Sequence, residues 1–171
     1  MSIVKIRKFA APDAPVSLYE TGGLLSAYDL LDSEGDIVMK GAFDHIPDGA
    51  RVPVFYNHEY STVPVGVAVL SKSLPGLRCA ITLTKGVQLA EELALALQAR
   101  TIEALSMGAW IDARDIRHTK KGRELHKVNI AEATLTPWGA NPEALLDKSA
   151  TRAAATADHE LFARLVKLFG A

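Results

Sequence analysis

The stretch Leu77-Arg78-Cys79-Ala80-Ile81-Thr82-Leu83 is the one that decides the fold class of this chain. Its apolar residues Leu77, Cys79, Ile81 and Leu83 share one parity. Successive side chains of a strand point to opposite faces, so this alternation predicts a half-buried β-strand. The same parity predicts that Cys79 is a small buried apolar residue rather than a catalytic thiol.

Further β patterns lie on both sides of this strand, and two segments have helical spacing. Strands are expected over 2–9, 15–20, 24–31, 52–56, 66–70, 103–113 and 124–136, with a solvated hairpin tip at 117–121. Pro53 favours an edge position or a strand start for its segment. Residues 87–99 repeat leucine every fourth position and predict an amphipathic helix. No β-α-β alternation is present, which favours an α+β, mainly β fold: a small antiparallel β-barrel or sheet core with flanking helices.

The amino-acid composition changes after residue 147, which indicates the end of a folded domain. Residues 148–157 consist of Lys, Ser, Ala, Thr and Arg, which is typical of a flexible linker. After it, Leu161, Leu165 and Leu168 lie on one face of a predicted amphipathic helix. We therefore expect one domain over 1–147 and a linker with a C-terminal helix over 148–171.

Charge and cysteine content narrow the class of protein. The 171 residues carry a formal net charge of -1, so no nucleic-acid partner is expected. A single cysteine allows no intrachain disulfide and fits a reducing compartment. Charged residues interrupt the N-terminal apolar run too early for a signal peptide, and no run approaches the ~20 residues that span a bilayer. A soluble intracellular protein without a membrane partner is expected.

Neither a metal nor a cofactor is expected. The acidic run at 32–36 around Gly35 resembles a calcium loop weakly, but Phe43 stands where such a loop would end in glutamate. His58-Glu59 lacks the second histidine of a zinc-protease motif.

Ser106 is the first candidate for chemistry, in Glu103-Ala-Leu-Ser-Met-Gly-Ala-Trp-Ile111. In a strand, Ser106 and Gly108 share the face opposite Leu105 and Met107. A hydroxyl beside a glycine leaves room for another backbone, as a substrate would need. On this pattern alone a structural serine is the more ordinary interpretation.

His58 ends the apolar strand pattern of 54–56, where a rigid scaffold gives way to a loop. An imidazole is a suitable general base because it titrates near neutral pH. A structural histidine again remains the ordinary alternative.

Glu132 has the parity of Val128 and Ile130, which directs its carboxylate to the apolar side of a regular strand. A buried carboxylate needs a partner, and an imidazole N–H is suitable; that is the orienting role in a catalytic triad. The alternative is a strand end with Glu132 in solvent. His126 shares the parity but lies about 20 Å from Glu132 along an extended strand, so only one of them can serve His58. His118 and His159 are given no role.

Several of these segments occur in the order found in a known family. They are Asp32-Ser-Glu-Gly-Asp-Ile-Val-Met-Lys-Gly-Ala-Phe43, Val54-Phe-Tyr-Asn-His-Glu59, Pro64-Val-Gly66, Ala104-Leu-Ser-Met-Gly108, Ala131-Glu-Ala-Thr-Leu-Thr136 and Ala140-Asn-Pro-Glu-Ala144. This set, over about residues 20–147, resembles the prohead proteases of tailed bacteriophages, which are related in fold to the herpesvirus assemblins. Met107 and Thr134 depart mildly from the usual pattern, the latter standing where a serine is typical.

The resemblance implies a serine endopeptidase with Ser106 as nucleophile, His58 as base and Glu132 as third member. Because assemblins use a histidine as third member, His126 is the rival. The implied partners are the major capsid protein precursor or its scaffold, and the implied location is the assembling prohead in the host cytoplasm. A homo-oligomer, self-cleavage in the linker at 148–155 and activation by assembly are further expectations. The alternative function is a non-catalytic capsid assembly or scaffold module that keeps the fold.

Overall fold

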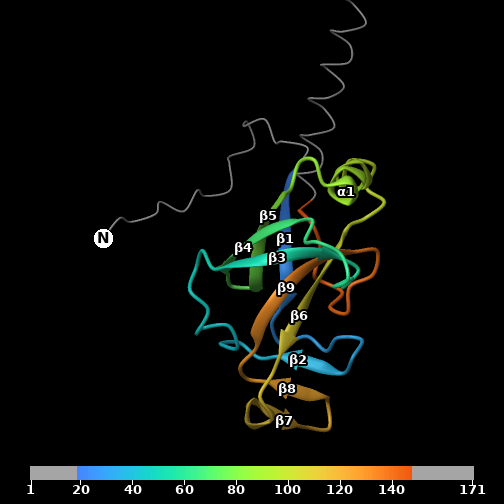
Figure 1. Cartoon of the computed structure of the whole chain (residues 1–171). Coiled ribbons are helices and arrows are strands. Elements are labelled where there is room, and N and C mark those ends of the chain that lie inside the picture. Colours follow the sequence, from blue (N-terminus) through green and yellow to red (C-terminus); the bar gives the residue numbers. More distant parts are fainter. Residues whose placement is uncertain (1–18, 148–171) are drawn as a thin grey trace, which may run out of the picture.

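The computed structural model describes residues 19–147, which form a mainly β fold with one α-helix (Figure 1). The elements are β1 (Glu20–Ala27), β2 (Asp36–Val38), β3 (Arg51–Tyr56), β4 (Gly66–Lys72), β5 (Gly76–Leu83), α1 (Gln88–Gln98), β6 (Ala104–Trp110), the 3₁₀ turn η1 (Ala113–Asp115), β7 (Ile116–His118), β8 (Arg123–Leu125) and β9 (Asn129–Thr136). The expected fold class is confirmed. The strand expected at 2–9, most of that at 15–20, and the C-terminal helix lie outside the described residues.

A six-stranded sheet in the order β1-β5-β4-β3-β9-β6 forms the body of the molecule. Its two edge strands approach each other, because Leu145 and Leu146 bridge them: Leu24 N donates to Leu145 O at 3.1 Å, and Leu146 N donates to Glu103 O at 2.9 Å. The sheet therefore curls into a half-barrel around its core. Most pairs are antiparallel as expected, but β3 and β9 run parallel, as do β2 and β8 of a small three-stranded sheet.

β5 confirms the alternation that predicted it. Leu77, Cys79, Ile81 and Leu83 are all at most 2% exposed and point into the curl of the sheet. Burying a leucine or isoleucine side chain contributes roughly 1.5–3 kcal/mol, so this one face of β5 accounts for a large share of the core. β5 pairs with β1 on one side and β4 on the other.

Some boundaries differ from those expected. The strand expected over 103–113 ends at Trp110, and the pattern over 124–136 is divided into β8 and β9. The hairpin tip at 117–121 is confirmed, since β7 and β8 pair antiparallel around it. Pro53 was expected at a sheet edge or at a strand start, but β3 lies between β4 and β9 and begins at Arg51, two residues before Pro53. Pro53 is tolerated because β9 begins to pair with β3 only at Val54.

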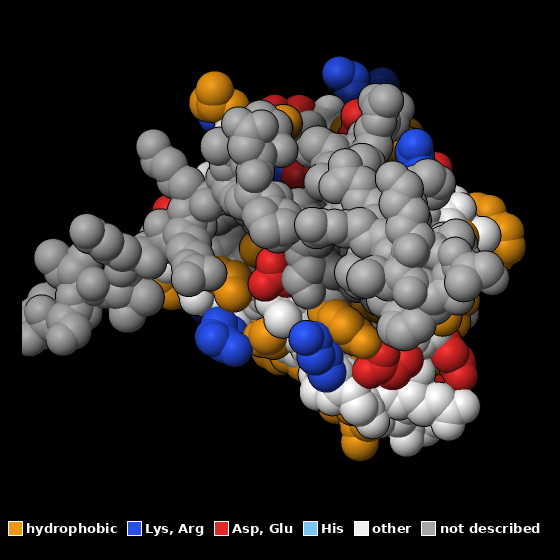
Figure 2. All heavy atoms as spheres, turned by 90° about the horizontal axis from the view of Figure 1, so that it is seen from above, with side chains coloured by type: hydrophobic (Ala, Val, Ile, Leu, Met, Phe, Trp, Pro, Cys, Tyr) orange, Lys and Arg blue, Asp and Glu red, His pale blue; other side chains and the backbone are white. Residues whose placement is uncertain are grey.

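α1 and the small sheet lie at opposite ends of the half-barrel (Figure 1). The helix expected over 87–99 is observed over Gln88–Gln98, and it buries Ala90, Leu93, Ala94 and Leu97. Between residues 19 and 147, no helix is both long and apolar enough to cross a bilayer. On the face seen in Figure 2, the visible acidic and basic side chains are interspersed, in agreement with the net charge of -1.

Candidate active site

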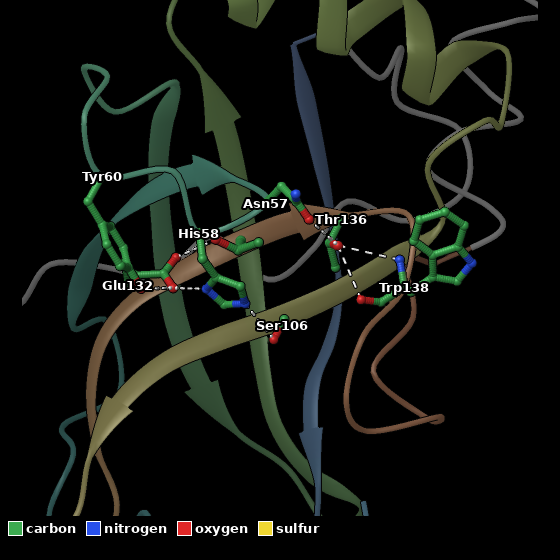
Figure 3. A network of polar contacts seen from close by, with 8 residues as sticks. Asn57, His58, Tyr60, Ser106, Glu132, Thr136 and Trp138 are labelled. Carbon is green, nitrogen blue, oxygen red and sulfur yellow. Dashed lines mark hydrogen bonds and ion pairs between the residues drawn. The ribbon is translucent and has the colours of Figure 1, made fainter. Parts of the chain in front are cut away.

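Ser106, His58 and Glu132 form one chain of hydrogen bonds (Figure 3). His58 Nε2 lies 3.1 Å from Ser106 Oγ, and His58 Nδ1 lies 2.8 Å from Glu132 Oε1. The fold thus brings together the three residues singled out in the sequence. An ionised carboxylate only accepts hydrogen bonds, so Nδ1 carries the proton and Nε2 is free to accept one from the serine hydroxyl. Such an arrangement can withdraw a proton from Ser106 as its oxygen attacks a carbonyl.

Three adjacent strands supply these side chains. Ser106 lies on β6 opposite Thr134 of β9, Glu132 lies on β9, and His58 follows the end of β3, the other neighbour of β9. β9 therefore separates the strand of the serine from the strand of the histidine. The imidazole has to cross β9 to reach Ser106, and the turn after β3 makes this possible.

That turn contains two successive residues in the left-handed region, Asn57 at φ 51° and His58 at φ 57°. For a residue other than glycine this conformation costs roughly 1–2 kcal/mol. Hydrogen bonds from Asn57 N to Leu135 O (3.0 Å) and from Thr136 Oγ1 to Asn57 Oδ1 (3.2 Å) hold it. Backbone strain maintained by its surroundings is common at functional sites, and here it directs the His58 ring over the sheet.

Glu132 forms the buried end of the chain of hydrogen bonds. Its side chain is 2% exposed, whereas that of His58 is 38% exposed. Besides His58, the carboxylate accepts from Tyr60 Oη at 3.2 Å and from Thr134 Oγ1 at 2.7 Å. Three donors satisfy a carboxylate that would otherwise be costly to bury. Burial raises the pKa of Tyr60, and the Glu132 charge and hydrogen bond raise it further, so Tyr60 remains a donor.

Tyr60 and Thr134 were not recognised as site residues in the sequence. Thr134 was noted only as a departure from the family serine, although the hydroxyl common to both residue types is the group that contacts Glu132. Tyr60 follows His58 by two residues, and that proximity was its only signal.

Gly108 has a second reason to lack a side chain, besides the room for a substrate that was expected from the sequence. A Cβ atom there would lie 2.5 Å from Glu132 Oε1 and 2.8 Å from Tyr60 Oη. The absent side chain therefore makes room for the Glu132 carboxylate and its tyrosine donor, and Gly108 also lines the cavity beside Ser106.

His126, the rival third member, is placed elsewhere. It follows β8 in the small sheet, its side chain is 46% exposed, and its Nε2 lies 3.4 Å from Glu124 Oε2. His118 lies exposed on β7, and His159 lies outside the described residues.

A cavity of about 340 Å³ opens beside the serine and the histidine. Its walls are both apolar and polar and come from β1, the loop before β2, β2, β6 and the segments around His58, β8 and 140–144. Gly139 packs against Leu105, since a Cβ there would lie 2.5 Å from Leu105 O, so the 139–141 loop borders the cavity close to Ser106. The cavity gives an extended ligand access to the hydroxyl.

Cys79 is 1% exposed, and burial raises the pKa of its thiol to about 12. A thiol in this environment stays protonated at neutral pH, which makes it a poor nucleophile and a poor metal ligand. Among residues 19–147, no three His, Cys, Asp or Glu side chains converge as a set of metal ligands.

Comparison with known proteins identifies relatives in sequence and in structure. The sequence model of a family described as "Caudovirus prohead serine protease" matches residues 19–159. The prohead protease of Enterobacteria phage HK97 is 30% identical over 126 residues, which are 71% of this chain and 56% of that protein. The chain thus spans little more than half the length of this relative.

Among solved structures, the KSHV protease in complex with a hexapeptide phosphonate inhibitor superposes with a TM-score of 0.55. The match covers 82% of this chain and 76% of the viral protease, at 14% sequence identity. A likeness at this identity shows a shared fold, and it confirms the expected herpesvirus protease architecture.

Proposed function

Because this chain belongs to the caudovirus prohead serine protease family, we propose that it is a serine endopeptidase with Ser106 as nucleophile, His58 as general base and Glu132 as the residue that orients His58. The observation that carries the proposal is the unbroken chain of hydrogen bonds from Ser106 Oγ through the imidazole to a buried carboxylate, at 3.1 and 2.8 Å. Residue types and geometry agree with the roles of a catalytic triad.

In the proposed reaction Ser106 Oγ attacks the carbonyl carbon of the peptide bond while its proton passes to His58 Nε2. The C–N bond then breaks, and the same proton passes from Nε2 to the leaving amine. A water molecule hydrolyses the acyl-serine ester by the same route, with His58 again taking and returning a proton. Glu132 keeps the proton of Nδ1 in place and stabilises the imidazolium that forms in each half of the reaction.

Peptide N–H groups of the 139–141 loop are the proposed donors to the oxyanion. Ala140 and Asn141 line the cavity that also contains Ser106. Their backbone N–H groups make no hydrogen bond within residues 19–147, although Ala140 O and Asn141 O both accept one. One such donor typically lowers the barrier by about 3–4 kcal/mol.

The proposed substrates are the phage capsid precursor and its scaffold, because the HK97 relative is named a prohead protease. We propose that cleavage takes place inside the assembling prohead in the host cytoplasm, by a homo-oligomer. In this scheme residues 1–147 are the protease domain. For the segment at 148–171 there are two alternative proposals: the protease cleaves itself in the linker, or the linker tethers the C-terminal segment to a scaffold.

Co-expression with the cognate capsid precursor tests the proposal. Wild type, Ser106→Ala and the control Ser71→Ala, whose serine lies on β4 away from the cavity, would be compared by intact mass of the precursor. Shortened precursor with wild type and Ser71→Ala, but not with Ser106→Ala, is expected. Equal shortening with all three would assign the nucleophile to another residue. If proheads form with the wild-type protein but their precursor is not shortened, the non-catalytic assembly module would be favoured.

A further inference from the structure

The cavity beside Ser106 has one acidic end. Asp32, Glu34 and Asp36 line it, and no lysine or arginine of the described chain does. The candidate nucleophile Ser106 and the base His58 line the same cavity. A ligand bound across Ser106 therefore extends toward three carboxylates.

One of these carboxylates is neutralised within the protein. Arg123 Nε and Nη2 donate to the two oxygens of Asp36 at 2.5 and 2.6 Å. The pKa of Arg123 is raised by this hydrogen bond first and by the Asp36 charge second, and Asp32 and Glu34 contribute as well. Arg123 thus forms its ion pair with Asp36, and Asp32 and Glu34 act on it only through their charge.

Two carboxylates remain without a cation. Asp32 Oδ1 accepts from the backbone N–H groups of Glu34 (2.9 Å) and Asp36 (2.8 Å), which fixes the position of the carboxylate. Within residues 19–147, Asp32 Oδ2 and the exposed Glu34 carboxylate have no hydrogen bond or ion pair. The loop therefore presents negative charge to the cavity in a fixed position.

A second polar group in the cavity also lacks a partner. Ser26 is 1% exposed, and its Oγ makes no hydrogen bond in the described structure. Leaving a buried hydroxyl unsatisfied costs about 1–3 kcal/mol, so such groups are uncommon unless a ligand completes them. Ser26 lines the cavity beside the apolar Leu25 and Val38. The cavity thus offers apolar contacts beside two carboxylates that have no ion pair of their own among the described residues.

We propose that the acidic end of the cavity is a specificity subsite that binds a lysine or arginine side chain of the substrate, close to the peptide bond that Ser106 attacks. The methylene stem of such a side chain packs on Leu25 and Val38, while its charged head reaches Asp32 and Glu34. A bare divalent cation fits less well, because no three ligating side chains converge here in the described residues. The assignment of this subsite to cleavage rests on the proposed protease function.

The first experiment measures which peptides are cleaved. Full-length protein is incubated with a peptide library made by cutting a bacterial proteome after glutamate, and mass spectrometry locates the new ends. Lysine or arginine is expected near the cleaved bond. Two synthetic peptides that differ only in lysine or norleucine at that position then give kcat/KM values, and a lysine preference of about tenfold or more is expected.

Variants test whether these carboxylates cause the preference. Asp32→Asn retains an oxygen for the two backbone N–H groups, so the double variant Asp32→Asn, Glu34→Gln should fold while its lysine-to-norleucine ratio falls toward one. Glu20→Gln, an exposed change outside the cavity, should keep the wild-type ratio. Wild type that cleaves both peptides equally, or a double variant that keeps the full preference, would overturn the subsite and leave the protease proposal intact.

A binding experiment separates the two proposals. Ser106→Ala is titrated with acetyl-Ala-Ala-Ala-Lys and with acetyl-Ala-Ala-Ala-norleucine, and amide NMR shifts are followed. Tighter binding of the lysine peptide, with shifts at residues 32–36 and at Ser26, supports the subsite. If wild type cleaves no peptide but the lysine peptide still binds more tightly, only the protease function is refuted. Equal affinity for both peptides overturns the subsite.

Discussion

Replacing Thr134 with valine removes one hydroxyl from the buried end of the site and nearly preserves the shape of the side chain. That hydroxyl donates to Glu132 Oε2 at 2.7 Å, and the two residues are 0% and 2% exposed. A hydrogen bond to a charged group contributes about 1.5–3 kcal/mol, and here its loss leaves a buried carboxylate oxygen without a donor. The expected loss in the free energy of unfolding is therefore about 2–3 kcal/mol.

The matched variant is Thr134→Ser, which keeps the hydroxyl and removes only a methyl group. Deleting one buried methyl costs about 1 kcal/mol, so Thr134→Ser should be clearly more stable than Thr134→Val. Urea unfolding followed by circular dichroism measures both free energies. In a peptidase assay, Thr134→Val should also lower kcat more than it changes KM, because a loosened Glu132 orients His58 less well.

If the Thr134 hydroxyl stabilises the buried carboxylate, Thr134→Val has to be less stable than Thr134→Ser. Thr134→Val that unfolds at the same urea concentration as Thr134→Ser, or at a higher one, would show that the buried carboxylate does not depend on this donor. Unchanged kcat in Thr134→Val would show that the imidazole is oriented without it.

Three further predictions concern neighbouring features. Gly108→Ala introduces a Cβ 2.5 Å from Glu132 Oε1 and should displace the carboxylate that orients His58. By comparison with triads whose histidine is wrongly oriented, kcat should fall roughly 100-fold or more. Full activity of Gly108→Ala would mean that the carboxylate can move aside without cost. Glu132→Gln should lower kcat by roughly 10²–10⁴, whereas His126→Gln should leave kcat within about twofold of wild type. The reverse order in the same assay would make His126 the third member of the triad. Burial raises the pKa of the Cys79 thiol from 9.0 to about 12, so its thiolate fraction at pH 8 is about a thousandfold below that of a free thiol. Iodoacetamide should therefore label Cys79 readily only when urea unfolds the protein. Rapid labelling of the folded protein would contradict the burial of this thiol.

The elements that could be predicted are those whose signal is local. The alternation of β5 and the four-residue leucine repeat of α1 follow directly from strand and helix periodicity, and both are confirmed. Each of these inferences needed only the residues of one segment. Glu132 is buried, but not for the reason that parity suggested: the register of β9 against β6 shifts between Ile130 and Glu132, so Glu132 lies on the face of Ser106 and Thr134 and not on that of Ile130.

What could not be predicted depends on contacts between distant segments. The parallel pairing of β3 with β9 joins residues about 80 positions apart, and no local pattern encodes it. Pro53 suggested an edge strand, because the sequence does not reveal that β9 starts to pair one residue later. The contact of Gly108 with Glu132 and Tyr60 could not be predicted either, because only the folded sheet brings these residues together.

The place of β9 between β3 and β6 has a consequence for the order of events during synthesis. A nascent chain that has reached β6 already contains the serine and the histidine, yet the strand that must lie between theirs has not been made. Until residues 129–136 have emerged from the ribosome, the growing chain therefore lacks Glu132 and the strand that lies between β3 and β6. Under the proposed mechanism a growing chain therefore stays inactive until β9 has been made, without any separate inhibitor.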